Sequence, residues 1–357
     1  SSDLENIYFC ENFIKKIMKA LNYLLVGLAL VGCSKNTTTE KDVTEETPKQ
    51  VSELMEKARN FFKSVSTLAP EAIPNEKIEL GKKLYFETKL SKEGNISCNS
   101  CHRLDGFGVD NLPTSPGDAG KLGVRNSPTV IYASLHTMQF WDGRAKDVEA
   151  QAEGPILNPV EHNIPSAEFL ENRLREIPEY QELFKKAFPN DAQPITFKNI
   201  VNAIGAFERQ FNPVSRFDKY LDGDDSALTQ QEKDGLQTYI NTGCITCHSG
   251  IAVGGQMFQK FGVFDEYQKY TKSKKVDLGL ADISKKDTDK FMFKVPGLRN
   301  VEKTAPYFHD GSVQKLEDAV RIMAKVQLNK DLKDKEVTDI VAFLKTLTAD
   351  IDAKYKK

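Results

Sequence analysis

Two short cysteine motifs constrain the fold of this chain more than any other feature. Cys98–His102 holds two cysteines two residues apart with a histidine directly after them, and Cys244–His248 repeats the pattern. This is the attachment signature of a c-type haem, in which each thiol adds to a vinyl group and the histidine becomes an axial iron ligand. A zinc knuckle or a disulfide would explain a single copy, but two copies use four of the six cysteines and favour two covalent haems. The expected haem-binding residues are Cys98, Cys101, His102, Cys244, Cys247 and His248.

Length and charge set the broad class. The 357 residues are enough for two ordinary domains, and the formal net charge of −2 gives no indication of a nucleic-acid partner. The other two cysteines, Cys10 and Cys33, precede the expected folded part and leave no pair for a structural disulfide. Haem attachment is itself a modification made in the export compartment, so we expect an exported protein.

Residues 1–33 have the pattern of a targeting segment. A basic region with Lys15, Lys16 and Lys19 precedes an apolar run at 21–31, which is well short of the ~20 residues that a spanning helix needs. The run ends at Cys33 in a sequence similar to the bacterial lipoprotein cleavage site, where the cysteine is lipidated. An ordinary signal peptide with a chance cysteine is the alternative. We expect a periplasmic protein anchored to the membrane through lipidated Cys33.

Residues 1–17 and 34–50 lie outside the expected folded part, and no structural role is expected for residues 1–17. Met18 is a candidate translation start, which makes residues 1–17 a tag or upstream translation. Residues 34–50 are rich in Thr, Glu and Lys without periodicity, which predicts a flexible tether.

Helical periodicity dominates from residue 51 onward. Helices are predicted near 76–86, 167–188 and 197–211, and Thr229 with Glu232 forms a capping box for another. The Gly- and Pro-rich stretch 102–140 predicts a long ordered loop around a haem edge. A first helical face is expected from Val51, Leu54, Met55, Ala58, Phe61, Phe62 and Val65. Because strand signals are few, we predict a mainly α protein with two haem domains, at 51–213 and 214–357, divided after Asn212-Pro213.

The two halves resemble a diverged duplication. Gly81–Phe86 precedes the first haem motif as Gly235–Ile240 precedes the second, and Phe140–Arg144 later matches Phe308–Ser312. The identity is weak, but the matches recur in the same order after each motif.

This alignment predicts that the two haems differ in their sixth ligand. Met323 lies twelve residues past Gly311, whereas the same offset in the first half falls on Pro155, which cannot ligate iron. A methionine ligand raises the potential of a c-type haem used for electron transfer. The prediction is therefore one closed and one open haem, although Met323 fits a core methionine equally well and Met257 and Met292 are rivals.

Polar residues near the open haem suggest peroxide chemistry. A carboxylate such as Glu161 above a ferric haem is able to deprotonate bound hydrogen peroxide, and the Gln151 amide is able to hold the peroxide. The only tryptophan, Trp141, is placed to relay electrons. Taken singly, each has an ordinary alternative: Glu and Gln are usually solvated, and a lone Trp usually lies in the core.

These residues carry a resemblance to a known family. From about residue 51 to the C-terminus the chain resembles the bacterial di-haem cytochrome c peroxidases, which consist of two cytochrome c-like domains. Besides both haem sites, the matching motifs are Phe140–Ala145, Gly154–Ile156 with Asn158, Pro159 and Glu161, Phe293–Pro296 with Leu298–Asn300, and Thr304–Gly311.

The resemblance implies a function and a role for each site residue. The first haem would be the low-potential peroxidatic one, with His102 proximal and Gln151 and Glu161 distal. The second would be the high-potential electron-entry haem held by His248 and Met323. Trp141 would lie between the two haems.

The resemblance also implies partners and a metal ion. The enzyme would reduce hydrogen peroxide to water with electrons from a small c-type cytochrome or a cupredoxin. A calcium ion would bind the Asn126 side chain and the backbone carbonyls of Thr304 and Pro306, oxygens that suit a hard cation. A homodimer is compatible with the sequence, which does not fix the oligomeric state.

The chain departs from the family in two places. Many members carry a histidine in the loop before Asn126 that blocks the peroxidatic iron until the other haem is reduced. Here Asp118 stands in that position, where we expect it to face solvent or an ion, and residues 103–135 contain no histidine. The methionine usual after the distal glutamate is His162. An open first haem is therefore predicted, unless His136 or His162 substitutes as its ligand.

Two other functional classes are compatible with the motifs. One is a maturation oxygenase of the same family, which modifies a protein substrate and has tyrosine as the second distal ligand; Met323 argues against it. The other is a di-haem electron carrier without turnover, which Gln151 and Glu161 argue against.

Overall fold

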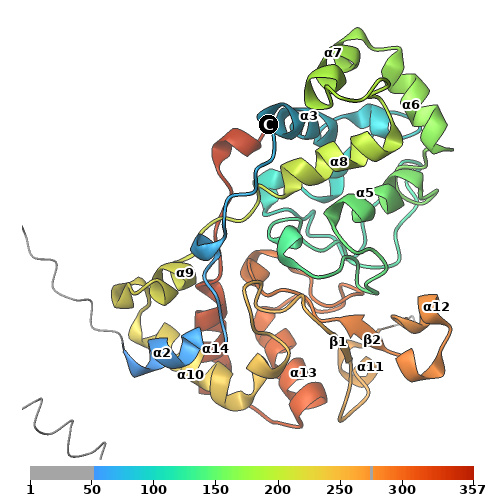
Figure 1. Cartoon of the computed structure of the whole chain (residues 1–357). Helices are drawn as coiled ribbons and strands as arrows, with labels where there is room; N and C mark the ends of the chain where they lie inside the picture. Colours follow the sequence, from blue (N-terminus) through green and yellow to red (C-terminus); the bar gives the residue numbers. More distant parts are fainter. Residues whose placement is uncertain (1–51, 274–275) are drawn as a thin grey trace, which may run out of the picture. The chain divides into compact units, whose positions relative to one another are not determined.

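A computed structural model describes residues 52–273 and 276–357. The predicted targeting segment and tether, residues 1–33 and 34–50, lie outside the described residues. Helices joined by long loops make up most of the described chain, together with one antiparallel pair of short strands, β1 (Phe258–Lys260) and β2 (Met292–Lys294) (Figure 1). The helices are α2 (Glu53–Arg59), α3 (Asn75–Tyr85), α4 (Cys98–Cys101), α5 (Val148–Leu157), α6 (Ala167–Arg175), α7 (Pro178–Ala187), α8 (Phe197–Glu208), α9 (Arg216–Leu221), α10 (Gln230–Thr242), α11 (Gln268–Thr271), α12 (Ala281–Ser284), α13 (Leu316–Leu328) and α14 (Asp334–Lys345). The mainly α class is confirmed.

Local sequence signals explain where the helices begin and end. The capping box that opens α10 is confirmed: Thr229 N donates to Glu232 Oε2 over 2.8 Å, and Glu232 N donates back to Thr229 Oγ1 over 3.4 Å. The pattern at 167–188 forms two helices, because Pro178 opens α7 and the chain before a proline is disfavoured as helix.

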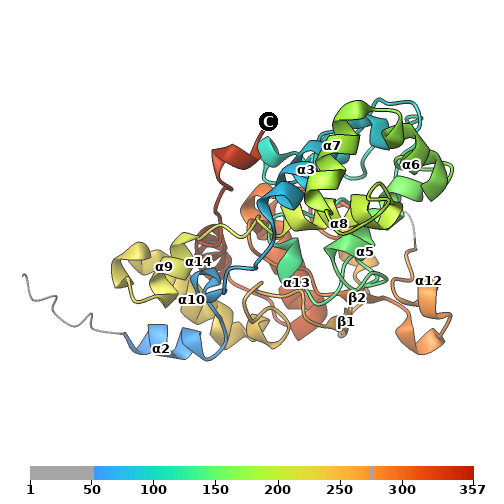
Figure 2. The same cartoon turned by 45° about the horizontal axis from the view of Figure 1, so that its top comes forward.

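The internal repeat of the sequence corresponds to two equivalent helix pairs in the structure. α3 packs against α8, and α10 packs against α14 (Figure 2). A Cβ on Gly81 would lie 1.9 Å from the Ala203 carbonyl oxygen, and a Cβ on Gly235 would lie 1.9 Å from that of Asp339. Only glycine permits backbones to approach so closely. The two glycines aligned in the sequence thus have the same packing role.

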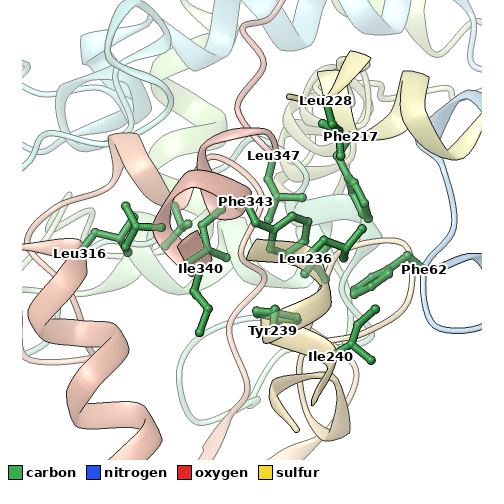
Figure 3. Close-up of a cluster of buried hydrophobic side chains, with 14 of the residues drawn as sticks. Phe62, Phe217, Leu228, Leu236, Tyr239, Ile240, Leu316, Ile340, Phe343 and Leu347 are labelled. Atoms are coloured by element: carbon green, nitrogen blue, oxygen red, sulfur yellow. The ribbon is translucent and has the colours of Figure 1, made fainter. Parts of the chain in front are cut away.

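The ends of the described chain pack against opposite halves. Met55, Ala58 and Phe62, in α2 and just after it, join the buried cluster built mainly from α9, α10 and α14 (Figure 3). Ile351 and Tyr355 near the C-terminus instead pack with the cluster around Tyr85, Phe207 and Phe211. The described residues fall in one contact unit, so the domain division after residue 213 stays a prediction.

The stretch 102–140 is the long loop that its glycines and prolines predict. Its only helical segments, after α4 ends at Cys101, are two 3-10 turns, Leu104–Gly106 and Ala133–Leu135. Among the described residues, no helix has both the length and the apolar character required to cross a bilayer.

Candidate functional site

Each Cys-x-x-Cys-His motif opens onto a cavity. The first cavity is lined by residues that include Cys98, Cys101, His102, Gln151, Glu161 and Trp141. The second is lined by residues that include Cys244, Cys247, His248, Met323 and Trp141. The structure thus brings the residues predicted for each haem to one place.

A tyrosine from the preceding helix fixes each motif. Tyr85 Oη of α3 donates to the His102 carbonyl oxygen over 2.6 Å, and Tyr239 Oη of α10 donates to that of His248 over 3.1 Å. Both tyrosines are buried, and they stand at equivalent places in the repeat. Packing of the helix pairs therefore determines where each proximal histidine lies.

Both histidines are suited to bind iron. His248 Nδ1 donates to the Pro296 carbonyl oxygen over 3.2 Å, which leaves Nε2 as the free ligand atom. Burial lowers the pKa of His248 to about 4 and also lowers the pKa of His102, so both rings are neutral, as a metal ligand must be. His102 Nδ1 is buried without a hydrogen-bond partner among the described residues.

The donor set fits covalent haem better than zinc. Across residues 52–273 and 276–357, no three or more His, Cys, Asp or Glu side chains converge as a metal site. Each pair of thiols instead borders a cavity that also presents the motif histidine. The residues at both positions therefore fit haem c.

The residues at the predicted sixth-ligand positions differ as the repeat indicates. Met323 of α13 lines the second cavity, and its rivals Met257 and Met292 do not. At the equivalent place in α5, Pro155 lines the first cavity. The chain therefore offers a thioether to the second haem and none at the matching position of the first.

Glu161 lines the first cavity, where its neighbour Asn158 holds its carboxyl group. Asn158 Nδ2 donates to Glu161 Oε1 over 2.8 Å. Burial raises the pKa of Glu161, and the Asn158 hydrogen bond and the nearby Arg144 charge oppose that rise. The Arg144 guanidinium lies 3.4 Å from the centre of the Phe140 ring and donates to Asp142.

Trp141 is the link between the two cavities. It lines both of them, as do Phe140 and the segment 126–129. Its indole Nε1 donates to the Asn126 carbonyl oxygen over 2.9 Å, which fixes the ring orientation.

Comparison with known proteins identifies the family. The family described as "Di-haem cytochrome c peroxidase" matches residues 75–226. Cytochrome c551 peroxidase of Nitrosomonas europaea is 48% identical over 273 residues, which cover 76% of this chain and 80% of that protein. The chain belongs to the di-haem cytochrome c peroxidase family. Cytochrome c551 peroxidase of Pseudomonas aeruginosa is 44% identical, over 84% of this peroxidase and 87% of that protein.

A solved structure agrees in fold. The crystal structure of a MauG-like protein associated with microbial copper homeostasis matches this peroxidase with a TM-score of 0.69. The two sequences are 29% identical, and the match covers 78% of this chain and 92% of that one. The mainly α fold is therefore shared with a protein at 29% sequence identity.

One sequence-based expectation about the peroxidase is wrong. Asp118 does not face solvent: it is only 4% exposed and does not line the first cavity. Its Oδ1 accepts from Glu93 N over 3.0 Å, and its backbone N–H donates to the Glu161 carbonyl oxygen over 2.8 Å. The backbone donor offsets the cost of burying the carboxyl group, and Asp118 thereby fastens its loop to the distal segment.

The two substitute ligands considered for the first haem occupy different cavities. His136 lines the second cavity, where its Nδ1 lies 3.3 Å from Lys294 Nζ. His162 lines the first cavity, and its Nδ1 is 3.0 Å from the Leu90 carbonyl oxygen. Of these two histidines, only His162 is placed near the first haem.

Several charged residues that line the cavities of the peroxidase were not predicted from the sequence. Arg144 and Glu208 line the first cavity, and Lys294 lines the second. Glu208 follows Phe207 as Leu344 follows Phe343, so extending the repeat to α8 and α14 would have found a carboxyl group at only one of the two sites.

Proposed function

We propose that this peroxidase reduces hydrogen peroxide to water in the first cavity with electrons that enter at the second. The observation that supports this assignment is the asymmetry of the two cavities. The first combines a haem motif with Glu161 and Gln151 and has Pro155 at the place of a ligand, whereas the second has Met323 there.

Glu161 is the acid–base group of the proposed reaction. When bound, the first haem supplies an iron at which peroxide binds and is reduced. Glu161 takes the proton from the inner peroxide oxygen and returns it to the leaving oxygen. The overall reaction consumes one hydrogen peroxide, two electrons and two protons and yields two water molecules. A buried carboxyl with a raised pKa is suited to both halves of this proton transfer.

Other side chains hold the reactants in place. Asn158 occupies one oxygen of Glu161, which leaves Oε2 to face the peroxide, and the Gln151 amide donates to the peroxide. At the second cavity His248 and Met323 would hold the electron-entry haem. Trp141, which borders both cavities, would relay electrons between them. The donor is a small c-type cytochrome or a cupredoxin.

A calcium ion is proposed next to the second cavity. Asn126, Thr304 and Pro306 all line that cavity. Asn126 Nδ2 donates to the Leu112 carbonyl oxygen, which orients its Oδ1 away from that bond. Within the described chain, no hydrogen bond is made to Asn126 Oδ1 or to the carbonyl oxygens of Thr304 and Pro306. Such oxygens are the ligands that calcium prefers.

The proposed location is the periplasm, with a membrane anchor at lipidated Cys33. It is supported by the basic and apolar pattern before Cys33 and by the need to attach haem in the export compartment. Replacing Cys33 by serine is expected to release the protein from the membrane fraction. A protein that stays in that fraction would exclude the anchor.

Peroxide turnover with a defined donor tests the function. Haem-loaded protein is mixed with a reduced small c-type cytochrome, and donor oxidation is followed after addition of hydrogen peroxide. Two donor molecules oxidised per peroxide are expected. Reduced haems that reoxidise without turnover would indicate an electron carrier. Failure with several donors, together with a spectrum lacking methionine ligation at the second haem, would favour the maturation oxygenase.

A further inference from the structure

Glu208, the last residue of α8, is a buried carboxyl group that the proposed reaction does not use. It is 5% exposed and lines the first cavity beside the haem motif. Its side chain accepts no hydrogen bond from any described residue. A buried carboxylate without a donor is costly, so the site favours the neutral acid. Burial, reinforced by the charge of Glu149 and opposed by that of Arg209, raises the pKa of Glu208 to about 8.

Among the described residues, no basic side chain forms an ion pair with Glu208, because its neighbour Arg209 is bonded to other carboxylates. Arg209 donates from Nε and Nη2 to the two carboxylate oxygens of Glu149 on α5, over 2.8 and 2.9 Å, and from Nη1 to Glu71 over 3.2 Å. The Tyr85 hydroxyl group of α3 donates its hydrogen bond to the His102 carbonyl oxygen and not to Glu208.

The first motif adds no charge that would pair with Glu208. Cys98 of α4 is close enough for Glu208 to raise the pKa of its thiol, but this sulfur becomes an uncharged thioether once haem is attached. Glu208 is therefore the group at this edge of the cavity that is free to change its protonation.

The internal repeat shows that this carboxyl group is specific to the first cavity. Ala203 and Phe207 contact Gly81 as Asp339 and Phe343 contact Gly235. The residue after Phe343 is Leu344, which lines the second cavity as Glu208 lines the first. An acid at the peroxidatic site thus stands where the electron-entry site has an aliphatic side chain.

We propose that Glu208 is the redox-linked proton site of the first haem. When Glu208 is ionised in the oxidised protein, each electron that arrives in the first cavity is accompanied by one proton that binds the Glu208 carboxylate, so the net charge of the cavity stays constant. The proton comes from solvent. When the electron passes to peroxide, Glu208 releases the proton, which is consumed in the reduction of peroxide to water. This inference rests on the proposed assignment of the first cavity as the peroxidatic site.

The chemistry predicts that Glu208 makes the midpoint potential of the first haem depend on pH. Below the pKa of Glu208 in the oxidised protein, the group is already protonated and the midpoint potential does not change with pH. Above it, reduction takes up a proton, and the potential falls by up to about 59 mV for each tenfold fall in proton concentration. The second cavity has Leu344 at the equivalent position, so Glu208 does not contribute a slope to the second-haem potential.

Spectroelectrochemical titration of the haem-loaded full chain between pH 6 and 10 tests the proposal. In the unmodified protein, the first-haem potential is expected to fall with rising pH. Glu208→Gln should abolish this slope and leave the second-haem potential unchanged, whereas Glu208→Asp should retain a slope. Glu161→Gln is the matched control: it removes the other carboxyl of the cavity and should keep the slope.

Three results would overturn the proposal. They are a first-haem potential that does not change with pH in the unmodified protein, a slope that persists in Glu208→Gln, and a slope that disappears in Glu161→Gln instead. The first needs no variant, so it decides the question even if Glu208→Gln does not fold. Peroxide turnover is measured separately, and its absence in the unmodified protein would contradict the proposed function without affecting the potentials.

Discussion

Asn158 holds the Glu161 carboxyl group through a 2.8 Å hydrogen bond from Nδ2 to Oε1. This contact fixes one oxygen and leaves the other for proton transfer. Glu161→Gln keeps the size and the hydrogen-bonding position but removes the acid–base function. We expect both haem spectra to stay nearly unchanged while peroxide turnover falls by roughly 10²–10⁴-fold, the usual contribution of one positioned acid–base group. Steady-state kinetics with a reduced cytochrome measures the loss.

The pH profile of the unmodified enzyme gives a second view of Glu161. Because burial raises its pKa, the carboxylate is protonated at a higher pH than an ordinary glutamate. The base form is present above that pKa, so kcat/KM should fall as pH decreases through it. Glu153, an exposed glutamate of the same helix as Gln151, provides the control variant Glu153→Gln. Turnover of Glu161→Gln within about twofold of the unmodified protein, where the full effect is expected, would exclude Glu161 as the base.

Met323 is expected to set the potential of the second haem. Axial ligands tune haem potentials over a range of ~0.8 V, and imidazole favours ferric iron more than a thioether does. Met323→His should therefore lower the second-haem potential and slow electron entry. A redox titration followed at the methionine–iron absorption band measures both ligand and potential. Met257→Leu is the control, since Met257 is 37% exposed and does not line the second cavity. An unchanged potential and band in Met323→His would remove Met323 from the site.

Helical periodicity and the two haem-attachment motifs predicted most of the fold from the sequence. The two haem motifs and the α10 capping box depend on residues close together in the sequence, and the repeat noted around Gly81 and Gly235 reappears as two equivalent helix contacts. Asp118 was misjudged because its burial depends on a backbone donor at Glu93, which no pattern in the sequence reveals. Glu208 was missed for a different reason: a single Glu on an amphipathic helix looks solvated unless the repeat is extended to α8 and α14.

The close backbone contact at Gly81 predicts that a larger side chain there lowers the free energy of unfolding. This effect is independent of peroxide turnover. The Cβ of Gly81→Ala would meet the Ala203 carbonyl oxygen at 1.9 Å, so α3 and α8 must separate. Overpacking of this kind typically costs ~1–3 kcal/mol. Thermal and denaturant unfolding of the haem-loaded protein measures the loss, and Gly235→Ala should behave alike. Gly106→Ala is the control, since its nearest new contact is an ordinary 3.5 Å. Equal stability of Gly81→Ala and Gly106→Ala would contradict the packing argument.

The ligation of the first haem in the fully oxidised protein is the last prediction. Asp118 is buried, does not line the first cavity and accepts a hydrogen bond from Glu93 N, so it does not reach the iron. For the same reason, Asp118→His is not expected to install the blocking ligand seen in many relatives. We predict a high-spin first haem, five-coordinate or water-bound, that reacts with peroxide at once and without prior reduction. Optical and spin-resonance spectra of the diferric sample measure the spin state.

His162 provides the decisive comparison for this prediction, because it is the histidine in the first cavity that is not assigned to the motif. Its Nδ1 bonds to the Leu90 carbonyl, and the ring is buried, which lowers the pKa of His162 and keeps it neutral. His162→Met, which restores the residue usual in the family, should leave the high-spin spectrum unchanged. A diferric sample that is low-spin, inert to peroxide until half-reduced, and converted to high-spin by His162→Met would overturn the open-site prediction and assign the block to His162.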